Sequence, residues 1–284
     1  MISRLALRAF LVLVPSLSAL ACAEEPTSAA PNSSTTGGET AEEAELKGKS
    51  LATRVAACDV AFENAEDQST AGMVEASGLW RSCLGKAVDA QKLGAKEIAA
   101  ARKSSALVCQ HKSAASTEAF GTLNRVESAS CPGARELDLA YLLDSYGPKQ
   151  SGTIPQTTLD TDACQAAFDT DTNGGEAPQQ TLNQAIWAQS ECYVERAVND
   201  IVQGLFDNVA QAKADGAGDT RFTDTYAGEQ ASVRASVDAD VRAYHQDLAA
   251  VCGAALEASG ESGGTLGVFL VGACQTHVFK RALP

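Results

Sequence analysis

The chain has 284 residues and a formal net charge of −14, from 36 acidic and 22 basic side chains. This charge argues against a protein that holds nucleic acid on a basic face, and against adsorption to anionic lipid headgroups. Its nine cysteines indicate disulfide bonds, and hence an oxidising compartment.

Residues 1–21 have the features of an export signal. Arg4 and Arg8 lie before and at the edge of a largely apolar stretch over residues 9–20, which is too short for a lasting membrane span. An Ala-x-Ala cleavage pattern ends this segment, and Cys22 follows at once, which resembles the lipobox of bacterial lipoproteins. Cleavage by an ordinary signal peptidase and cleavage with lipidation of Cys22 are both compatible with this pattern.

The number of cysteines favours a lipidated Cys22. Of the nine cysteines, one follows the cleavage site and eight remain, four in each of two repeated segments. Without the lipid, an exported protein would carry an odd free cysteine, which is unusual. We therefore expect an exported, membrane-anchored lipoprotein of the cell envelope that faces the periplasm or the exterior. Residues 22–50 are rich in Ser, Thr, Gly, Pro and Glu and predict a disordered, flexible tether.

The rest of the chain contains one pattern twice. Residues 109–131 and 252–274 are bounded by cysteines, have equal length and share Ala-Ser-x-Glu-x-x-Gly-Thr-Leu. The sequence ACDVAFE at 57–63 returns in the second half as ACQAAFD. The second copy is longer by 37 residues, 34 of which lie between its second and third cysteines. We interpret this pattern as a duplication, with repeat 1 over 51–150 and repeat 2 over 157–284.

Repeat 1 is predicted to be helical throughout. Ala, Leu, Glu, Lys and Gln dominate the chain, and no run alternates apolar and polar residues for long enough to form a strand. We expect helices over 71–91 and 95–113 with a break at Gly94. A short helix and a Pro/Gly/Ser-containing linker are expected after Cys131.

In repeat 2 the insertion is expected to lengthen the two middle helices and the turn between them. The first of these helices is predicted over 181–213. Its buried face is expected to carry Trp187, Val194, Val198, Ile201, Leu205 and Val209. The second carries an apolar stripe from Val233 to Val251 and is predicted to end near Gly253.

Four cysteines allow three pairings in each repeat. The ungapped separation of 22 residues between the third and fourth cysteines of both copies favours a helical hairpin closed by its own bridge. A bridge over a loop of this size contributes about 3 kcal/mol. The expected bonds are Cys58–Cys83, Cys109–Cys131, Cys164–Cys192 and Cys252–Cys274. The predicted fold class is all-α, with two tandem disulfide-stapled helical bundles after a disordered tether.

The sequence contains few groups that carry chemistry. His111, His245 and His277 are not accompanied by a Gly-x-Ser-x-Gly elbow or a spare cysteine, and no zinc-binding pattern occurs. We expect His245 and His277 at the surface or at helix ends. Trp80 and Trp187 precede the second cysteine of their repeats by three and five positions and are expected in the core. We therefore predict a protein that is not an enzyme and has no cofactor or metal.

One segment resembles the start of a calcium-binding loop. Residues 169–180 place two aspartates and an asparagine at the first, third and fifth positions. The eighth and twelfth positions, which need an apolar residue and a bidentate Glu, hold Glu176 and Gln180. We favour a polar turn that breaks the helix after Phe168, with calcium binding at 169–180 as the alternative.

Repeat 2 resembles the LprI-like lysozyme-inhibitor domains, which are small, helical, four-cysteine units of exported proteins. A cysteine near the start and a second one that opens a long helix correspond to Cys164 and Cys192. A glycine turn, the last cysteine, and a Thr and Arg ahead of a Leu follow in both. Here these are Gly263, Gly264, Thr265, Cys274, Thr276, Arg281 and Leu283. The chain departs from the family at Tyr244 and Leu248, where Trp and Arg are usual, and repeat 1 is more degenerate.

The resemblance implies a cell-envelope protein that binds lysozyme and blocks its cleft. Lysozymes of the animal type are strongly basic, whereas removal of residues 1–21 takes away two arginines and no acid and leaves this chain at −16. Opposite charges would assist their encounter. The small, polar segment ASGESGG at 258–264 is the best candidate to enter a sugar-binding cleft, with Glu261, Ser262 and Gly263 as partner-binding residues. The alternative is a structural or interaction lipoprotein of the envelope with an unknown protein partner and no inhibitory activity.

Overall fold

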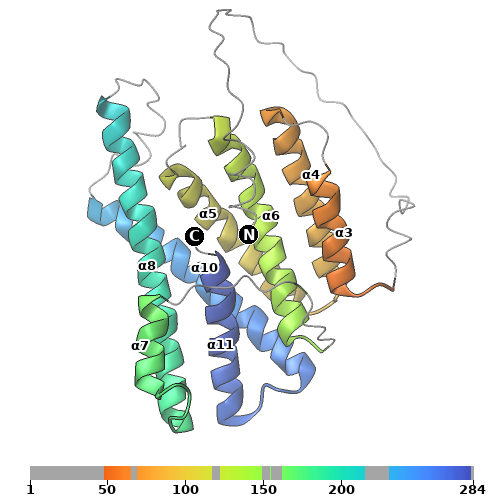
Figure 1. The fold of residues 1–284 in the computed structure, drawn as a ribbon, viewed down its shortest axis with the longest axis vertical. Coiled ribbons are helices and arrows are strands. Elements are labelled where there is room, and N and C mark those ends of the chain that lie inside the picture. The colour runs from red at the N-terminus through yellow and green to blue at the C-terminus, as the bar shows by residue number, and fades with distance from the viewer. Residues whose placement is uncertain are drawn as a thin grey trace, which may run out of the picture. The chain divides into compact units, whose positions relative to one another are not determined.

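The computed structural model describes residues 48–64, 69–116, 122–148, 154, 162–214 and 230–282. The expected signal peptide, Cys22 and nearly all of the tether lie outside these residues. The described part is built from helices without a strand, which confirms the all-α prediction (Figure 1). The helices are α3 (Leu51–Glu63), α4 (Thr70–Asp89), α5 (Ala95–Ala115), α6 (Thr122–Tyr146), α7 (Ala163–Thr172), α8 (Gln179–Ala214), α10 (Gln230–Ser259) and α11 (Gly264–Ala282).

Helices and disulfides follow in the same order in both halves. The first bridge of each half, Cys58–Cys83 or Cys164–Cys192, joins the first helix to the second. The second bridge, Cys109–Cys131 or Cys252–Cys274, joins the third helix to the fourth. The pairing expected from the cysteine spacing is therefore the one found in the structure.

The ends of several helices are set by the residue types that the sequence places there. Ser50, Ser69 and Asp162 each accept a hydrogen bond from a backbone N–H three residues later, which caps α3, α4 and α7. Gly94 adopts φ +52° and separates α4 from α5 at the predicted break. The helix predicted over 181–213 is confirmed as α8.

The insertion in repeat 2 lengthens the middle helices as predicted. Helices α8 and α10 have 36 and 30 residues, whereas α4 and α5 have 20 and 21. However, α10 does not end near Gly253. Its buried face continues through Ala255 and Leu256, and open space surrounds the position of Gly253, so this glycine is simply part of the helix.

Helix α6 is much longer than the short helix expected after Cys131. It has 25 residues and contains Pro132 in its interior. The proline removes one backbone donor from the helix, but packing on α4 maintains the helical path. At Gly133, the next residue, an added Cβ would lie 2.4 Å from the ring of Trp80 on α4. The Pro-Gly pair therefore marks a close helix contact and does not mark a turn.

The two repeats share one hydrophobic core. Residues 49–284 form a single compact unit, in which α5 packs on α8 and α10, and α6 packs on α10 and α11. The buried cluster is continuous across the halves and includes Val108 of α5, Leu142 of α6, Val241 and Leu248 of α10 and Val278 of α11. Each repeat therefore covers apolar surface of the other.

Polar contacts fasten the C-terminal end of α5 to α8. The side-chain amide of Asn208 donates hydrogen bonds to the carbonyls of Ala114 (2.8 Å) and Ser116 (2.7 Å), which would otherwise lack helical partners. Four residues earlier, an added Cβ at Gly204 would lie 2.4 Å from the carbonyl oxygen of Ala115. This close approach requires glycine at that position.

A buried ionic group joins α6 to α11. Asp138 lies 3.0 Å from the guanidinium of Arg135 and 3.5 Å from that of Arg281, and all three side chains are buried. The Arg281 guanidinium also stacks over the Tyr141 ring, 4.3 Å from its centroid. Removing one member of such a group leaves a buried charge without compensation and is strongly destabilising.

Candidate protein-binding site

The α10–α11 turn is fixed in space by the way α10 ends. Gly260 adopts φ +81°, and its N–H bonds to the carbonyl of Glu257 at 3.1 Å. The N–H of Glu261 reaches back to the carbonyl of Leu256 at 2.8 Å. This pair of bonds is the Schellman arrangement, which satisfies the last carbonyls of a helix and directs the chain away from it.

The start of α11 also depends on glycine. Gly264 has φ +70°, and an added Cβ at Gly267 would lie 2.3 Å from the carbonyl oxygen of Ser262. Any side chain at that position would displace the turn. The equivalent position in repeat 1, 143 residues earlier, is Asn124.

The predicted partner-binding residues lie together on this turn. Glu261, Ser262 and Gly263 are all exposed. The turn is shorter than the predicted segment, because Ala258 and Ser259 belong to the last turn of α10. The disulfide between α10 and α11 closes the same hairpin, so the three residues are presented by two cross-linked helices.

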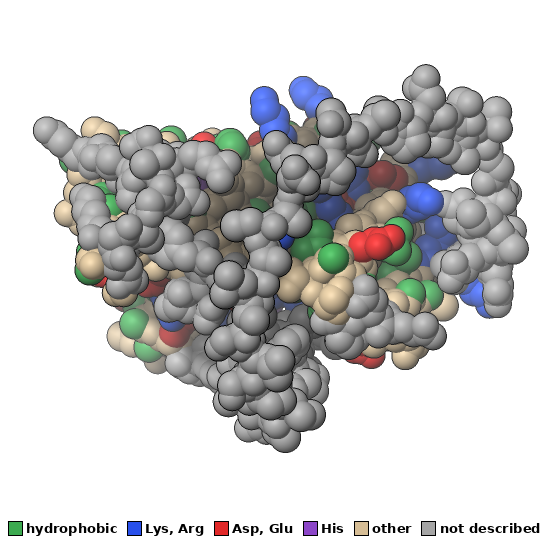
Figure 2. All heavy atoms as spheres, turned by 90° about the horizontal axis from the view of Figure 1, so that it is seen from above, with side chains coloured by type: hydrophobic (Ala, Val, Ile, Leu, Met, Phe, Trp, Pro, Cys, Tyr) green, Lys and Arg blue, Asp and Glu red, His purple; other side chains and the backbone are tan. Residues whose placement is uncertain are grey.

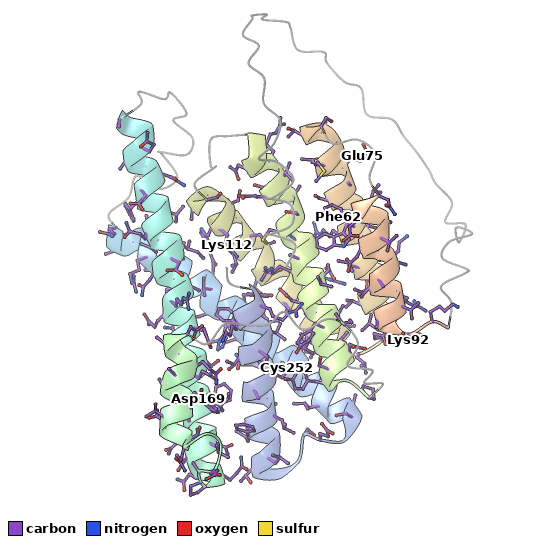
Figure 3. The ribbon with its side chains drawn as sticks, in the orientation of Figure 1. Phe62, Glu75, Lys92, Lys112, Asp169 and Cys252 are labelled. Atoms are coloured by element: carbon purple, nitrogen blue, oxygen red, sulfur yellow. A yellow bond between two sulfur atoms is a disulfide. The ribbon has the colours of Figure 1, made fainter. Side chains whose placement is uncertain are left out.

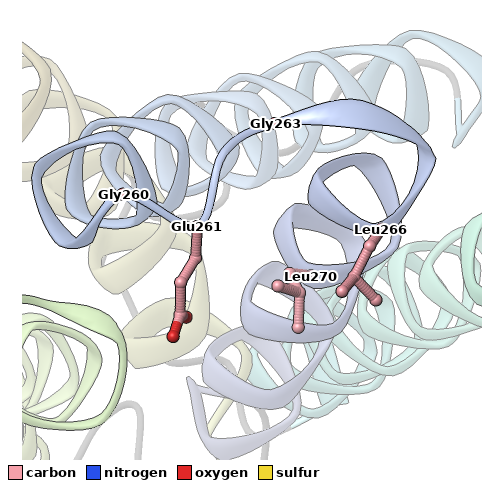
Figure 4. Close-up of a pocket in the computed structure, with 5 residues that line it drawn as sticks. All are labelled: Gly260, Glu261, Gly263, Leu266 and Leu270. Atoms are coloured by element: carbon pink, nitrogen blue, oxygen red, sulfur yellow. The ribbon is translucent and has the colours of Figure 1, made fainter.

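An open hollow of about 400 Å³ lies beside the turn and is lined by Gly260, Glu261, Gly263, Leu266 and Leu270. We call it the α11 hollow. Figure 4 shows the Glu261 side chain extending from the turn on the side where Leu266 and Leu270 project from α11. Leu266 is 55% exposed although it is apolar. The hollow therefore combines an aliphatic wall with one carboxylate, and it offers neither a nucleophile nor a pair of acid–base groups.

The negative charge of the chain is concentrated in repeat 2. Residues 51–150 contain 12 acidic and 11 basic residues, whereas residues 157–284 contain 18 and 7. On the face in Figure 2, the Lys and Arg side chains lie mainly in the centre and right of the view, the side on which Figure 1 places α3 and α4 of repeat 1. The turn and the α11 hollow thus belong to the acidic half of the protein.

His245 is buried, so its prediction as a surface or helix-end residue is wrong. Its Nε2 lies 2.6 Å from the hydroxyl of Ser190, and Gln275 donates to its backbone carbonyl. Burial lowers the pKa of His245 to about 4. Ser190 is only 1% exposed, so this serine–histidine contact joins α8 to α10 inside the core and is closed to a macromolecular substrate.

The other two histidines make contacts between the halves. His277 is exposed near the end of α11, as predicted, with its Nδ1 3.1 Å from the hydroxyl of Tyr146. His111 of α5 lies 2.8 Å from the carboxylate of Asp240 on α10. These distances fit roles in holding α5, α6, α10 and α11 together.

Trp80 is buried in the core, as predicted. Its ring stacks on Phe62, which Figure 3 labels on α3, with the ring centroids 5.1 Å apart. Its Nε1 donates to the carboxylate of Asp59 at 2.8 Å. The tryptophan thus packs α4 against both α3 and α6.

The prediction is wrong for Trp187, which is 41% exposed. Successive helical residues are rotated by about 100°, so its two extra positions before the second cysteine turn it roughly 200° away from the place of Trp80. That place, three residues before Cys192, is held by Gln189. Gln189 donates to the side chain of Gln165 at 2.9 Å, where repeat 1 has the bond from Trp80 to Asp59.

The calcium-loop pattern is not assembled as a loop. Asp169 and Asp171 lie within α7, and Gln165 donates to the Asp169 carboxylate (Figure 3). Asn173, with φ +50°, follows the last residue of that helix, Thr172. The predicted polar turn is present, although it begins later than Phe168. Within the ranges that the structure describes, no group of three or more His, Cys, Asp or Glu side chains is placed to hold a metal.

Three further residues of the family resemblance pack inside the protein. Cys274 and Thr276 are buried, and Arg281 belongs to the ionic group with Asp138. Leu283 lies outside the described residues. Tyr244, where the chain departs from the family, is also buried, at 1% exposed. None of the described helices has the length and apolar content needed to cross a membrane.

Comparison of the chain with protein-family models, with curated proteins and with solved structures gave no match. The likeness to LprI-like domains therefore rests on the residues described above.

Proposed function

We propose that this chain is an exported, lipid-anchored protein of the cell envelope that acts by binding a basic protein, and that it inhibits lysozyme in this way. In this proposal it performs no catalysis. The observation that carries the proposal is the location of an exposed, hydrogen-bonded, acid-bearing turn in repeat 2, which has 18 acidic and 7 basic residues.

The amino-terminal sequence supports the proposed location in the cell envelope. A charged and apolar leader is followed by Cys22, and this is the only cysteine outside the four disulfides. A lipid on Cys22 and a polar tether up to residue 50 would hold the helical part clear of the membrane surface. A basic enzyme that reaches the envelope would meet the anchored protein there.

Electrostatics supports the choice of partner. An acidic repeat 2 attracts a basic protein over several ångströms and raises the rate of encounter at low salt. The α10–α11 turn supports the mode of inhibition, because it is narrow, polar and held by cross-linked helices. A turn that is ordered before binding loses little conformational entropy when it enters a cleft.

A lysozyme turbidity assay tests the proposal. The mature chain, added in excess over an animal-type lysozyme at low salt, is expected to slow the clearing of a bacterial cell-wall suspension. An unrelated protein of equal size and net charge serves as the control for nonspecific adsorption. Clearing at the uninhibited rate, or equal slowing by the control protein, would contradict inhibition by this chain.

A further inference from the structure

The first half of α11 carries apolar residues that are exposed or only partly buried. Val268 is 47% exposed and Leu270 lines the α11 hollow. The ungapped match between the repeats places Arg125 and Glu127 at these positions in repeat 1. Both of those side chains are exposed on α6. The corresponding part of α6 is therefore helical with charged residues at both positions.

Neighbouring apolar side chains that stay accessible in a folded protein can mark a contact surface. Here they adjoin a single carboxylate, since Glu261 lines the same hollow as Leu266 and Leu270 (Figure 4). A carboxylate beside an aliphatic wall suits a group that has an apolar stem and a cationic tip. Lysine and arginine side chains have this construction, because their methylene stems pack on apolar surfaces while the charged group remains solvated or paired.

We infer that the α11 hollow receives a lysine or arginine side chain of the basic protein partner. The methylene stem lies against Leu266 and Leu270, and the cationic group pairs with the Glu261 carboxylate. The inference rests on the proposed function, because the occupant belongs to that partner. The charge of repeat 2 supports this occupant over an acidic or purely apolar one.

The glycines of the turn give the hollow its shape. Gly260 and Gly263 line it without side chains, so the space beside Glu261 stays open. The Schellman bonds hold the backbone of Glu261 in place beside the hollow. The repeat 1 counterpart of Leu270 is Glu127, which accepts a hydrogen bond from Ser116 at 2.6 Å. A hollow with the same wall is therefore absent from that position of repeat 1.

Titration calorimetry with an animal-type lysozyme at low salt tests the inference in the mature chain. Two variants address the hollow, Glu261→Gln and Leu270→Gln. Two matched controls make the same changes elsewhere, namely Glu257→Gln on the exposed side of α10 and Leu79→Gln at the exposed leucine of α4. The controls account for the loss of one charge and for the exchange of one accessible leucine for glutamine.

We expect Glu261→Gln to weaken binding about tenfold, as for the loss of a hydrogen bond to a charged group, and Glu257→Gln to weaken it by about twofold or less. Leu270→Gln is expected to weaken binding roughly fivefold through lost apolar contact, and Leu79→Gln to leave it unchanged. If the occupant is lysine, Glu261→Gln should no longer weaken binding to a lysozyme whose lysines are acetylated. If the occupant is arginine, the effect should persist with that lysozyme.

The outcomes separate the two claims. If the wild-type chain binds lysozyme but each variant of the hollow behaves like its control, the inference is overturned and the proposed function stands. If the wild-type chain does not bind lysozyme at all, the proposed function fails and the inference fails with it. Circular dichroism of each variant checks that the helices are intact.

Discussion

At the scale of single residues, the least expected finding is the buried His245. The apolar stripe of α10 includes Val241, Tyr244 and Leu248, and His245 lies within the same arc of the helix. Because its ring is polar, the sequence nevertheless predicts that His245 lies at the surface or at a helix end. The partner that makes its burial tolerable is Ser190, 55 positions away in the sequence. Periodicity in the sequence cannot predict such a pair. A buried polar group needs a hydrogen-bond partner, and any element of the fold can supply that partner.

This burial predicts a dependence of stability on pH. The pKa of His245 is lowered to about 4, below the ordinary value of 6.5. The unfolded chain therefore takes up a proton at a higher pH than the folded chain, and stability is lost as the pH falls from 6.5 to 4. The loss amounts to about 3 kcal/mol. The charge of Glu191 raises the pKa of His245 and the charge of Arg242 lowers it, so these two effects partly cancel.

The comparison is made with His245→Gln, which keeps a polar side chain near Ser190 and removes the titration. Urea unfolding at pH 7 and at pH 4 measures the difference in unfolding free energy between the two proteins. Between pH 7 and pH 4, the wild-type protein should lose about 3 kcal/mol more unfolding free energy than the variant does. A difference that is independent of pH would show that His245 is not held neutral by burial.

At the scale of helices, the sequence predicted their presence better than their ends. The limits of α8 and the break at Gly94 were predicted well, because apolar periodicity and a glycine mark them locally. Helix α6 begins before Cys131, although only a short helix was expected after that residue, and α10 runs past Gly253, where it was expected to end. In both cases packing decides the length, since α6 is held against α4 and α10 continues to bury apolar residues.

The candidate site was only half predictable for a related reason. The polar, glycine-rich composition of the turn identified Glu261, Ser262 and Gly263. The leucine wall of the α11 hollow was missed, because Leu266 and Leu270 resemble ordinary core residues in an apolar helix. The useful signal was present in the alignment of the repeats, where Leu270 is matched by the charged Glu127.

The contact between α5 and α8 provides a prediction at this scale. Asn208→Ala should lower the unfolding free energy by about 1–3 kcal/mol, because two carbonyls at the end of α5 lose their donors. Asn199→Ala, at an exposed position of the same helix, should change it by less than about 0.5 kcal/mol. Urea unfolding compares the two variants. Equal values would mean that Asn208 does not fasten α5 to α8.

At the scale of the whole molecule, the two halves have the same order of helices and disulfides but different surface charge. The halves share the order of their helices and disulfides and bury a common core, but one half is nearly neutral and the other strongly acidic. Charge of this kind has little influence on the fold and a large influence on which proteins approach. Under the proposed function, the acidic repeat 2 meets the partner and repeat 1 supports it.

The most direct test of this account is the affinity of the mature chain for an animal-type lysozyme at two salt concentrations. We predict binding at about 20 mM salt that weakens by at least roughly tenfold at about 300 mM, because screening shortens the range of the attraction. Absence of binding at the lower concentration, or an affinity that does not change with salt, would contradict the account.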